Sequence, residues 1–581
     1  IYNILGMEKR HLAKVIFLET FFSAVVAIGG GLVAGIAFSK LMCMLLYAMI
    51  GYHAEIVFYV SESGVVSTIL LFAGIFMLTF IYNLFQIQLA KPVELLHGSS
   101  QGEREPKTKK LMAIVGIVTL AAGYYMAITV DNPVTAVLLF FVAVILVIIG
   151  TYFIFMAGSI AVLKFLRKRK SYYYKKKHFV AVSGLIYRMK QNAAGLASIC
   201  ILSTMVLVVI SSTVSMYAGL DDELATRYQG DIGVSIISEN PITEGDTLRE
   251  LVNRTIQQEN RSIKEEQGMM TLTFSCISED GNLVIRKHDD EGDYSSDIIM
   301  LRMITREDYE EAYNVRVLEL SDHEVVLVTS DGYDKDTITV GDYTYPILQK
   351  QHFSSENGHW MDNQVYYMVV NSVEDMAPLY EAQKEIYGKN ASSYYYSLYI
   401  DIDGNKEEKI ACGNAVSAAI GASGMEEGHD GKYYIMIENR AENEDSFRQM
   451  YGGFLFLGIF LGILFLMITV LIIFYKQISE GYEDKERFAI MEKVGMSNEE
   501  VKKTISAQIR MVFLLPIVTA ALHVLAAFPM IRMILAVMNL NNGRLFAYCL
   551  LGTIAVFTVI YLLVYKMTSR TYYRIVGHQI G

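Results

Sequence analysis

Eight apolar runs of roughly twenty residues each constrain the fold of this chain more than any other feature. A run of about 20 apolar residues is the length that crosses the hydrocarbon core of a bilayer as an α-helix. Hydrophobic residues make up 53% of the 581-residue chain, more than a soluble protein needs for cores of ordinary size. The sequence therefore predicts a polytopic α-helical membrane protein. We place the spans at 15–37, 65–87, 111–130, 134–163, 193–217, 451–475, 508–537 and 547–567.

Most of the polar residues lie in one block, 218–450, between the fifth and sixth spans. This block carries a net charge of −27, and the rest of the chain carries +16. Alternating apolar residues within it predict strands, and apolar residues three to four apart predict helices, so we expect one α+β domain. We expect strands to begin near 231, 271, 324, 336, 364, 394 and 432, and helices near 247, 372 and 406.

Basic residues gather in the short loops. The segment 164–190 holds ten Lys and Arg residues and no acidic one, and the tail after Tyr565 holds three and no carboxylate. By the positive-inside rule both segments are cytoplasmic. Counting spans from them predicts that both termini lie in the cytoplasm and that the 218–450 domain is extracellular. The basic, tyrosine-rich stretch 164–179 suits anionic membrane lipids, with a partner protein as the alternative.

One motif occurs twice, at Tyr2–Glu19 and at Met491–Gln508. The two copies align at a shift of 489 residues. The aligned pairs include Gly6 with Gly495 and Met7 with Met496. In the second copy we expect a helix to stop at Gly495, the residue type that often ends helices.

The second copy then restarts a helix that continues into a membrane span. Ser497 and Glu500 have the spacing of a capping box, and an apolar stripe follows them. The first copy has Glu8 where the cap serine would stand, so its cap is expected to be weaker. We interpret each copy as a cytoplasmic elbow of helix, glycine break and helix.

A second correspondence, between 80–98 and 559–577, extends this duplication. It predicts a first half at 1–98, a linker at 99–192, a span at 193–217, the outer domain at 218–450 and a second half at 451–581. The linker contains the hairpin of spans 111–130 and 134–163 and the basic loop. By symmetry with the second half, we expect two further spans ahead of Ile1 in the natural protein.

Residues that carry enzymatic chemistry are sparse. No G-x-x-x-x-G-K-[ST] loop is present, so the chain itself is not expected to bind or hydrolyse ATP. His323 and Glu324 begin like a zinc-protease helix, but Leu327 stands where the second His is required, and we expect no metal site. Cys276 and Cys412 both fall in the outer block, and their spacing leaves open whether they pair.

Ionisable residues inside the predicted spans are candidates for function because burying charge in lipid is costly. They are Glu19, His523 and Arg532. Glu19 lies near the cytoplasmic interface, where it reaches water or pairs with Lys14, so a structural role is favoured for it. Glycines four residues apart predict close helix packing within the chain, with a dimer face as the alternative. These pairs are Gly31 with Gly35 and Gly458 with Gly462.

The chain resembles the FtsX-like permease family, and more closely the bacitracin-resistance permeases of Gram-positive bacteria. Four strings carry the resemblance: IYNILGMEKR, KPVELLHGSSQGEREPK, VSGLIYRMKQNAAGLASICILSTMVLV and KERFAIMEKVGM. It covers essentially the whole chain, although that type has ten spans and eight are visible here.

The resemblance implies a non-catalytic permease subunit that pairs with a separate ABC ATPase, usually two copies, which binds the ATP and Mg. The elbows would dock on that ATPase, and the residues carried over by position are Gly6, Met7, Glu8, Gly495, Met496, Ser497 and Glu500. It further implies that the outer domain engages antimicrobial peptides that trap lipid-linked cell-wall precursors, and that a membrane sensor histidine kinase is a partner. No nucleic-acid partner is expected.

Other functions stay open at this stage. An extracytoplasmic sensor that signals to a histidine kinase would need no ATPase. A lipoprotein-release or cell-division role within the same family is a further alternative. An enzyme would need a catalytic constellation, and the sequence shows none. The sequence does not identify the peptide or lipid.

Overall fold

The computed structural model divides the chain into two compact units, each described here by itself. The helical unit comprises Ile1–Val214, Gln449–Ile531 and Tyr548–Gly581, and the sheet unit comprises Ser215–Arg448 and Arg532–Ala547. The structure describes residues 8–51, 59–89, 109–130, 133–173, 176–239, 241–279, 281–286, 298–321, 323–329, 332–352, 365–425, 434–493, 498–538 and 540–577.

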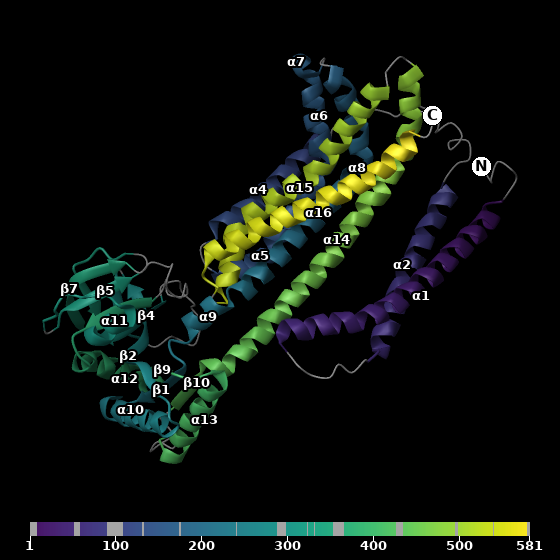
Figure 1. Cartoon of the computed structure of the whole chain (residues 1–581). Helices are drawn as coiled ribbons and strands as arrows, with labels where there is room; N and C mark the ends of the chain where they lie inside the picture. Colours follow the sequence, from purple (N-terminus) through teal and green to yellow (C-terminus); the bar gives the residue numbers. More distant parts are fainter. Residues whose placement is uncertain are drawn as a thin grey trace. The chain divides into compact units, whose positions relative to one another are not determined.

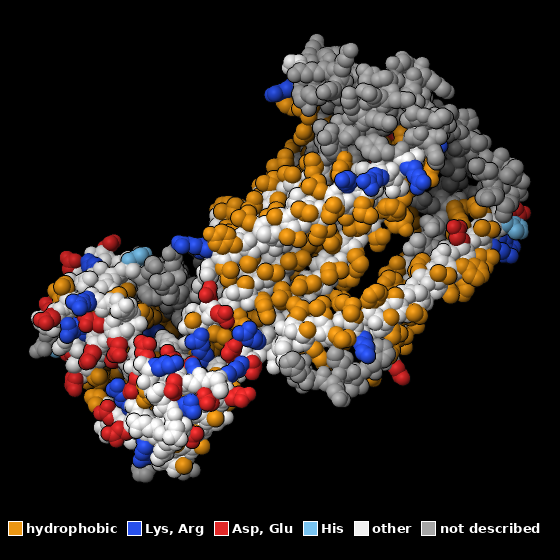
Figure 2. All heavy atoms as spheres, in the orientation of Figure 1, with side chains coloured by type: hydrophobic (Ala, Val, Ile, Leu, Met, Phe, Trp, Pro, Cys, Tyr) orange, Lys and Arg blue, Asp and Glu red, His pale blue; other side chains and the backbone are white. Residues whose placement is uncertain are grey.

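Eight helices of the described residues are long and apolar enough to span a membrane, one for each predicted span. The helices are α1 (Lys9–Ile50), α2 (Glu62–Leu89), α4 (Lys110–Thr129), α5 (Pro133–Phe153) continued by the π-turn η1 (Ile154–Gly158) and α6 (Ser159–Lys168), α8 (Lys176–Ala218), α14 (Arg440–Lys493), α15 (Asn498–Ala536) and α16 (Gly543–Gly577); the four-residue α7 (Lys170–Tyr173) stands between α6 and α8. The predicted class, a polytopic helical membrane protein with one α+β domain, is confirmed. On the face of the molecule that Figure 2 displays, hydrophobic side chains cover most of the helical surface that is described.

Several of the helices are much longer than the predicted spans, among them α1 and α14. α1 continues past 37 to Ile50, and α14 begins at Arg440, eleven residues before 451, and runs to Lys493. At 1.5 Å per residue, the 54 residues of α14 measure about 80 Å, whereas a bilayer core is about 30 Å thick. The apolar run marks only the part of a helix that faces lipid, because polar flanks extend a helix without changing that pattern.

Glycines stand at several close helix contacts of the helical unit. In the hairpin of α4 and α5, a Cβ on Gly116 would lie 2.8 Å from Phe153 Cβ, and one on Gly150 would lie 2.8 Å from the Leu120 nitrogen. Between α14 and α8, a Cβ on Gly458 would lie 2.1 Å from the Thr213 hydroxyl oxygen. Small residues therefore let these backbones approach.

The predicted glycine pairs differ in outcome. Gly458 and Gly462 pack against α8 within the chain, as predicted for helix packing inside a single chain. Nothing among the described atoms lies within 4 Å of a Cβ built on Gly31 or Gly35. The structure of this single chain therefore gives those two glycines no packing role.

The sheet unit is built from ten strands and five principal helices among the described residues (Figure 1). The strands are β1 (Ile232–Ser238), β2 (Ile263–Glu279), β3 (Asn282–Val284), β4 (Ile298–Thr305), β5 (Val325–Thr329), β6 (Thr337–Val340), β7 (Tyr343–His352), β8 (Val365–Val370), β9 (Tyr394–Ile402) and β10 (Tyr434–Asn439). The helices are α9 (Leu220–Arg227), α10 (Pro241–Gln258), α11 (Arg306–Tyr313), α12 (Ala377–Tyr387) and α13 (Lys406–Ser423), with the short 3₁₀ turns η3 (Glu374–Met376) and η4 (Gly388–Asn390). All seven predicted strands and all three predicted helices of the block are present.

The strands pair in the order β10-β1-β9-β2-β3-β6-β7-β5-β8-β4, and β4 also pairs with β2. The part from β2 to β4 therefore closes on itself, and β9, β1 and β10 extend it from β2. Side chains such as Leu272, Met303 and Val340 form the core of the closed part, and α12 contributes Leu379 to it. A second core, with Val234 and Leu398, packs α10 and α13 against the extension.

Cys276 and Cys412, whose pairing the sequence left open, are both free thiols. Cys276 is buried in the core of the closed strands, and Cys412 is buried between α13 and the extension. Because the two thiols belong to separate cores, the fold of the sheet unit does not rest on a bond between them.

Candidate functional site

Most of the predicted elbow residues lie outside the described residues. This applies to Gly6, Met7, Gly495, Met496 and Ser497 and to the side chain of Glu500. Glu8 precedes α1, where its carbonyl oxygen accepts bonds from the amides of His11 and Leu12, and its side chain makes no capping bond. The description of α14 ends at Lys493, and that of α15 begins at Asn498. The ATPase-coupling role of these residues stays a prediction.

Glu19 lies on an exposed face of α1, beside a groove of about 410 Å³ between α1 and α2. The groove is also lined by polar side chains of α2, namely Thr79, Asn83 and Gln86. Glu19 forms no ion pair with Lys14 in the structure, although the sequence offered that pairing. The groove instead gathers uncharged polar groups next to the Glu19 carboxylate.

His523 lies in the interior of the helical unit, where 3% of its surface is exposed. Its Nδ1 lies 2.6 Å from the hydroxyl of Tyr124 on α4, and its Nε2 lies 3.0 Å from the hydroxyl of Thr151 on α5. The Thr151 hydroxyl donates to the carbonyl oxygen of Val147 at 2.6 Å. Thr151 therefore accepts from His523 Nε2–H, and in a neutral ring Nδ1 accepts from Tyr124. His523 thus fastens α15 to the α4–α5 hairpin.

A polar cluster that we did not predict joins α8, α14 and α16. Lys476 donates to the carbonyl oxygen of Asn192 at 2.7 Å, and the Asn192 amide donates to the Glu480 carboxylate. Asp484 accepts from the Tyr572 hydroxyl at 2.5 Å, and both side chains are buried. Lys476, Glu480 and Asp484 are four residues apart on α14, so a helical polar stripe after the apolar run was the available signal.

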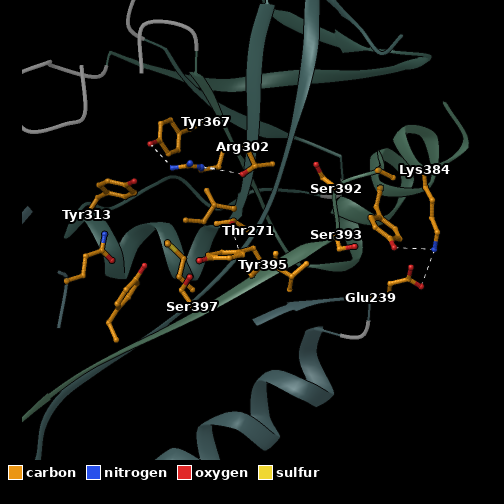
Figure 3. A pocket seen from close by; sticks show the side chains of 18 of the residues that line it. Glu239, Thr271, Arg302, Tyr313, Tyr367, Lys384, Ser392, Ser393, Tyr395 and Ser397 are labelled. Carbon is orange, nitrogen blue, oxygen red and sulfur yellow. Dashed lines mark hydrogen bonds and ion pairs between the residues drawn. The ribbon is translucent and has the colours of Figure 1, made fainter. Parts of the chain in front are cut away.

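The sheet unit contains a cavity of about 1250 Å³ that the sequence reasoning did not locate (Figure 3). Its floor is one face of five neighbouring strands. Ile237, Tyr395, Thr271 and Ile304 lie opposite one another across β1, β9, β2 and β4. Thr273, Arg302 and Tyr367 form the next row, across β2, β4 and β8. Because side chains two apart on a strand share a face, the residues between them fill the cores instead.

The rim of this cavity comes from segments between the strands. It includes Arg227 and Gln229 at the end of α9, Tyr313 of α11, and Tyr380 and Lys384 of α12 with the η4 turn after it. Figure 3 shows Arg302 and Tyr367 together on one side and Lys384 with Glu239 on another. The signal in the sequence was the alternation of polar residues along β2 and β9, but it did not show that the two strands are neighbours.

Two of the cations that line the cavity have carboxylate partners. Lys384 lies 3.3 Å from Glu239, and Arg227 lies 3.6 Å from Glu438. The hydrogen bond from Lys384 to the Tyr380 hydroxyl, with the nearby Glu239 carboxylate, raises the pKa of Lys384 above its usual value. Both side chains therefore stay charged at neutral pH.

Arg302 is held differently, by neutral groups. Its Nε donates to the Thr273 hydroxyl at 3.4 Å and its Nη1 donates to the Tyr367 hydroxyl at 3.2 Å. Its guanidinium carbon lies 5.4 Å from the centre of the Tyr367 ring. Among the described residues, no carboxylate forms an ion pair with Arg302.

The fold and these sites define a class: a multi-span membrane protein with one large α+β domain between its spans. Comparison with known proteins agrees with this class and narrows it. No protein-family model matches the chain. Curated relatives along nearly its full length are nevertheless ABC transporter permeases, as follows.

The chain is 23% identical to the uncharacterized ABC transporter permease YvcS of Bacillus subtilis, over 99% of the chain and 85% of that protein. It is 24% identical to the ABC transporter permease protein YxdM of the same organism, over 95% of the chain and 83% of that protein. It is 22% identical to the bacitracin export permease protein BceB of Bacillus subtilis, over 90% of the chain and 79% of that protein. The resemblance to ABC transporter permeases of the bacitracin type is thereby confirmed.

Proposed function

We propose that this chain is the permease subunit of an ABC transporter that protects a bacterium against cell-wall-targeting antimicrobial peptides of the bacitracin kind. A separate ATPase, in two copies, binds the ATP and Mg and supplies the energy. The observation that carries the proposal is the similarity, over nearly the whole chain, to ABC transporter permeases that include a bacitracin export permease. The peptide, or the lipid-linked cell-wall precursor that it traps, is the species acted on.

The dimensions of α14 support a mechanical relay rather than a pore. This single helix begins directly after β10 of the sheet unit and continues to Lys493, two residues before Gly495 of the second elbow. A continuous helix of about 80 Å transmits a displacement along its axis with little loss. In this proposal, closure of the ATPase moves the elbow, and α14 passes the movement to the outer domain.

The polar cluster on α14 supports the same mechanism. Buried hydrogen bonds tie Lys476 and Glu480 to α8, and Asp484 to α16. Separating buried charged groups from their partners is costly, so these three helices are expected to move together near the elbow. By the positive-inside rule, the basic loops support a topology with the elbows on the cytoplasmic side and the 218–450 domain outside the cell.

Deletion of the gene tests the function. Sensitivity is measured across a panel of cell-wall-active peptides, and we expect hypersensitivity to at least one of them that the wild-type gene restores. Unchanged sensitivity to the whole panel would contradict the resistance function.

Substitution at the second elbow tests the coupling. Gly495→Val with Ser497→Leu is expected to abolish resistance while membrane expression and ATP hydrolysis by the partner persist. Gly453→Val is the matched control, because nothing lies within 4 Å of a Cβ built on Gly453. Resistance that survives the elbow substitutions would refute the coupling role.

Co-purification separates this function from that of a pure sensor. A permease is expected to be recovered with an ATPase, whereas a sensor that signals to a histidine kinase needs none. Recovery of the kinase alone, together with unchanged resistance, would favour the sensor. Recovery of both would fit a transporter that also signals.

A further inference from the structure

The cavity of the sheet unit has a charge opposite to that of the domain around it. Its lining contains the cations Arg227, Arg302, Lys384 and Lys389 and one carboxylate, Glu239. The block 218–450 as a whole carries −27. A random sample of such a domain would be acidic, so this concentration of cations marks the cavity as a distinct electrostatic environment.

Arg302 is the centre of this environment. It stands on β4, in the floor, and its only described hydrogen bonds go to the neutral hydroxyls of Thr273 and Tyr367. Two of its five N–H donors are used in this way, and Nη2 is left facing no described carboxylate. A half-buried guanidinium without an anionic partner is costly, and a planar fork of donors matches a carboxylate or phosphate.

The hydroxyl bonds also fix the orientation of the guanidinium. Thr273 lies opposite Arg302 on β2 and Tyr367 lies opposite it on β8, so the two neighbouring strands hold the side chain from both sides. A side chain held in this way loses little rotamer freedom when it binds a ligand. The site is therefore organised before the ligand arrives.

The rest of the lining suits an organic body. Five tyrosines, at 313, 367, 380, 395 and 399, supply flat apolar surfaces with hydroxyl groups, and Thr271, Ser392 and Ser397 add further hydrogen-bonding groups. A cavity of about 1250 Å³ is far larger than a free inorganic anion and exceeds the size of typical drug-sized sites. A cationic or metal ligand does not fit, because the lining would repel it.

We propose that this cavity binds an oxyanion, a carboxylate or a phosphate, carried on a body of peptide or sugar size, and that Arg302 is its main anchor. Lys389, on the exposed η4 turn at the rim, adds a second positive charge without a described ion pair. The inference rests on the proposed function only in taking the bound group to belong to the species that the transporter acts on. The prediction that an oxyanion binds rests on the residues that line the cavity alone.

The test uses the full chain in nanodiscs of zwitterionic lipid and calorimetry with two pairs of probes. The first pair is the tripeptide alanyl-alanyl-tyrosine with a free C-terminal carboxylate and the same peptide as its amide. The second pair is glucose 1-phosphate and glucose. We expect at least one charged probe to bind, and we expect its neutral counterpart to bind at least tenfold more weakly. Which charged probe binds distinguishes a carboxylate from a phosphate.

The variants are Arg302→Gln, Arg302→Lys, Lys389→Gln and the control Arg254→Gln. We expect Arg302→Gln to weaken the charged probe tenfold or more, Arg302→Lys to restore part of the affinity, and the control to have no effect, because Arg254 is exposed on α10 outside the cavity. Lys389 is on the surface, so Lys389→Gln is expected to lower the affinity for the charged probe severalfold without disturbing the fold.

Three results would overturn the inference: no binding of either charged probe at millimolar concentration, equal binding of a charged probe and its neutral twin, or full affinity in both Arg302→Gln and Lys389→Gln. Peptide resistance in cells is measured separately with the same variants. If a variant loses probe binding but keeps resistance, the binding site is supported and its link to the transporter function is refuted. If deletion of the gene abolishes resistance but no charged probe binds, the transporter function is supported and the proposed binding site is refuted.

Discussion

Removal of the Tyr124 hydroxyl measures how firmly the α4–α5 hairpin is attached to α15. Tyr124→Phe deletes the donor that lies 2.6 Å from His523 Nδ1 and keeps the ring that packs edge-on at a centroid distance of 5.8 Å. His523 is 3% exposed, so water does not replace the lost donor. The change therefore isolates one interhelical hydrogen bond.

The expected magnitude follows from two terms. Interhelical hydrogen bonds in membranes contribute about 0.6 kcal/mol on average and about 1.7 kcal/mol at most. A buried acceptor left without a donor adds a desolvation penalty of about 1 kcal/mol or more, part of which is already contained in those averages. We expect Tyr124→Phe to lower the free energy of unfolding by about 1–2 kcal/mol.

The assay is unfolding of the full chain in mixed detergent micelles, with the neighbouring variant Tyr125→Phe as control. Tyr125 lies on the exposed side of α4, with 69% of its surface accessible, so its hydroxyl is expected to contribute almost nothing. Equal stability of the two variants would refute the reasoning. Thr151→Val gives a second check, because combining it with Tyr124→Phe should produce a non-additive loss through their shared partner His523.

Two further predictions concern packing and thiol chemistry. Gly458→Ala is expected to weaken the α8–α14 contact by about 1–3 kcal/mol in the same unfolding assay, because its Cβ would lie 2.1 Å from the Thr213 hydroxyl oxygen, whereas Gly453→Ala has open space and should be tolerated. Burial raises the pKa of the Cys276 thiol from 9.0 to about 12, so maleimide labelling of Cys276 should stay negligible from pH 7 to pH 9 until the domain unfolds. Because the pKa of Cys276 is higher in the folded state than in the unfolded state, the stability that its protonated thiol contributes should be lost as pH rises above about 9. Rapid labelling of the native chain at pH 8 would contradict both statements.

The sequence predicted the membrane spans well, because each depends on local composition alone. It also predicted seven strands, including β5, every residue of which is buried. It did not predict β4, in which Arg302 interrupts an otherwise apolar run. It missed β7 because Pro346 is a residue that ordinarily argues against a strand.

The candidate sites were harder to predict because they join distant parts of the chain. His523 was identified from its costly position, but its partners Tyr124 and Thr151 lie 399 and 372 residues away in sequence. The cavity draws on five strands whose order in the sheet does not follow their order in the chain. Strand order is set by packing across the whole domain, and local patterns do not encode it.

The charge of the outer domain and the charge of its cavity act over different distances. The net −27 of the 218–450 block attracts cationic species from solution, but salt screens this attraction beyond about 10 Å. Within the cavity, contact with Arg302 selects an anion instead. A ligand that satisfies both conditions carries positive charge on a part that stays outside the cavity and a carboxylate or phosphate on the part that enters it. Long-range attraction then governs the rate of encounter, and Arg302 governs how long the ligand stays. Added salt should therefore slow the association of such a ligand and change its dissociation rate much less. Arg302→Gln should instead speed its dissociation and change its association rate much less.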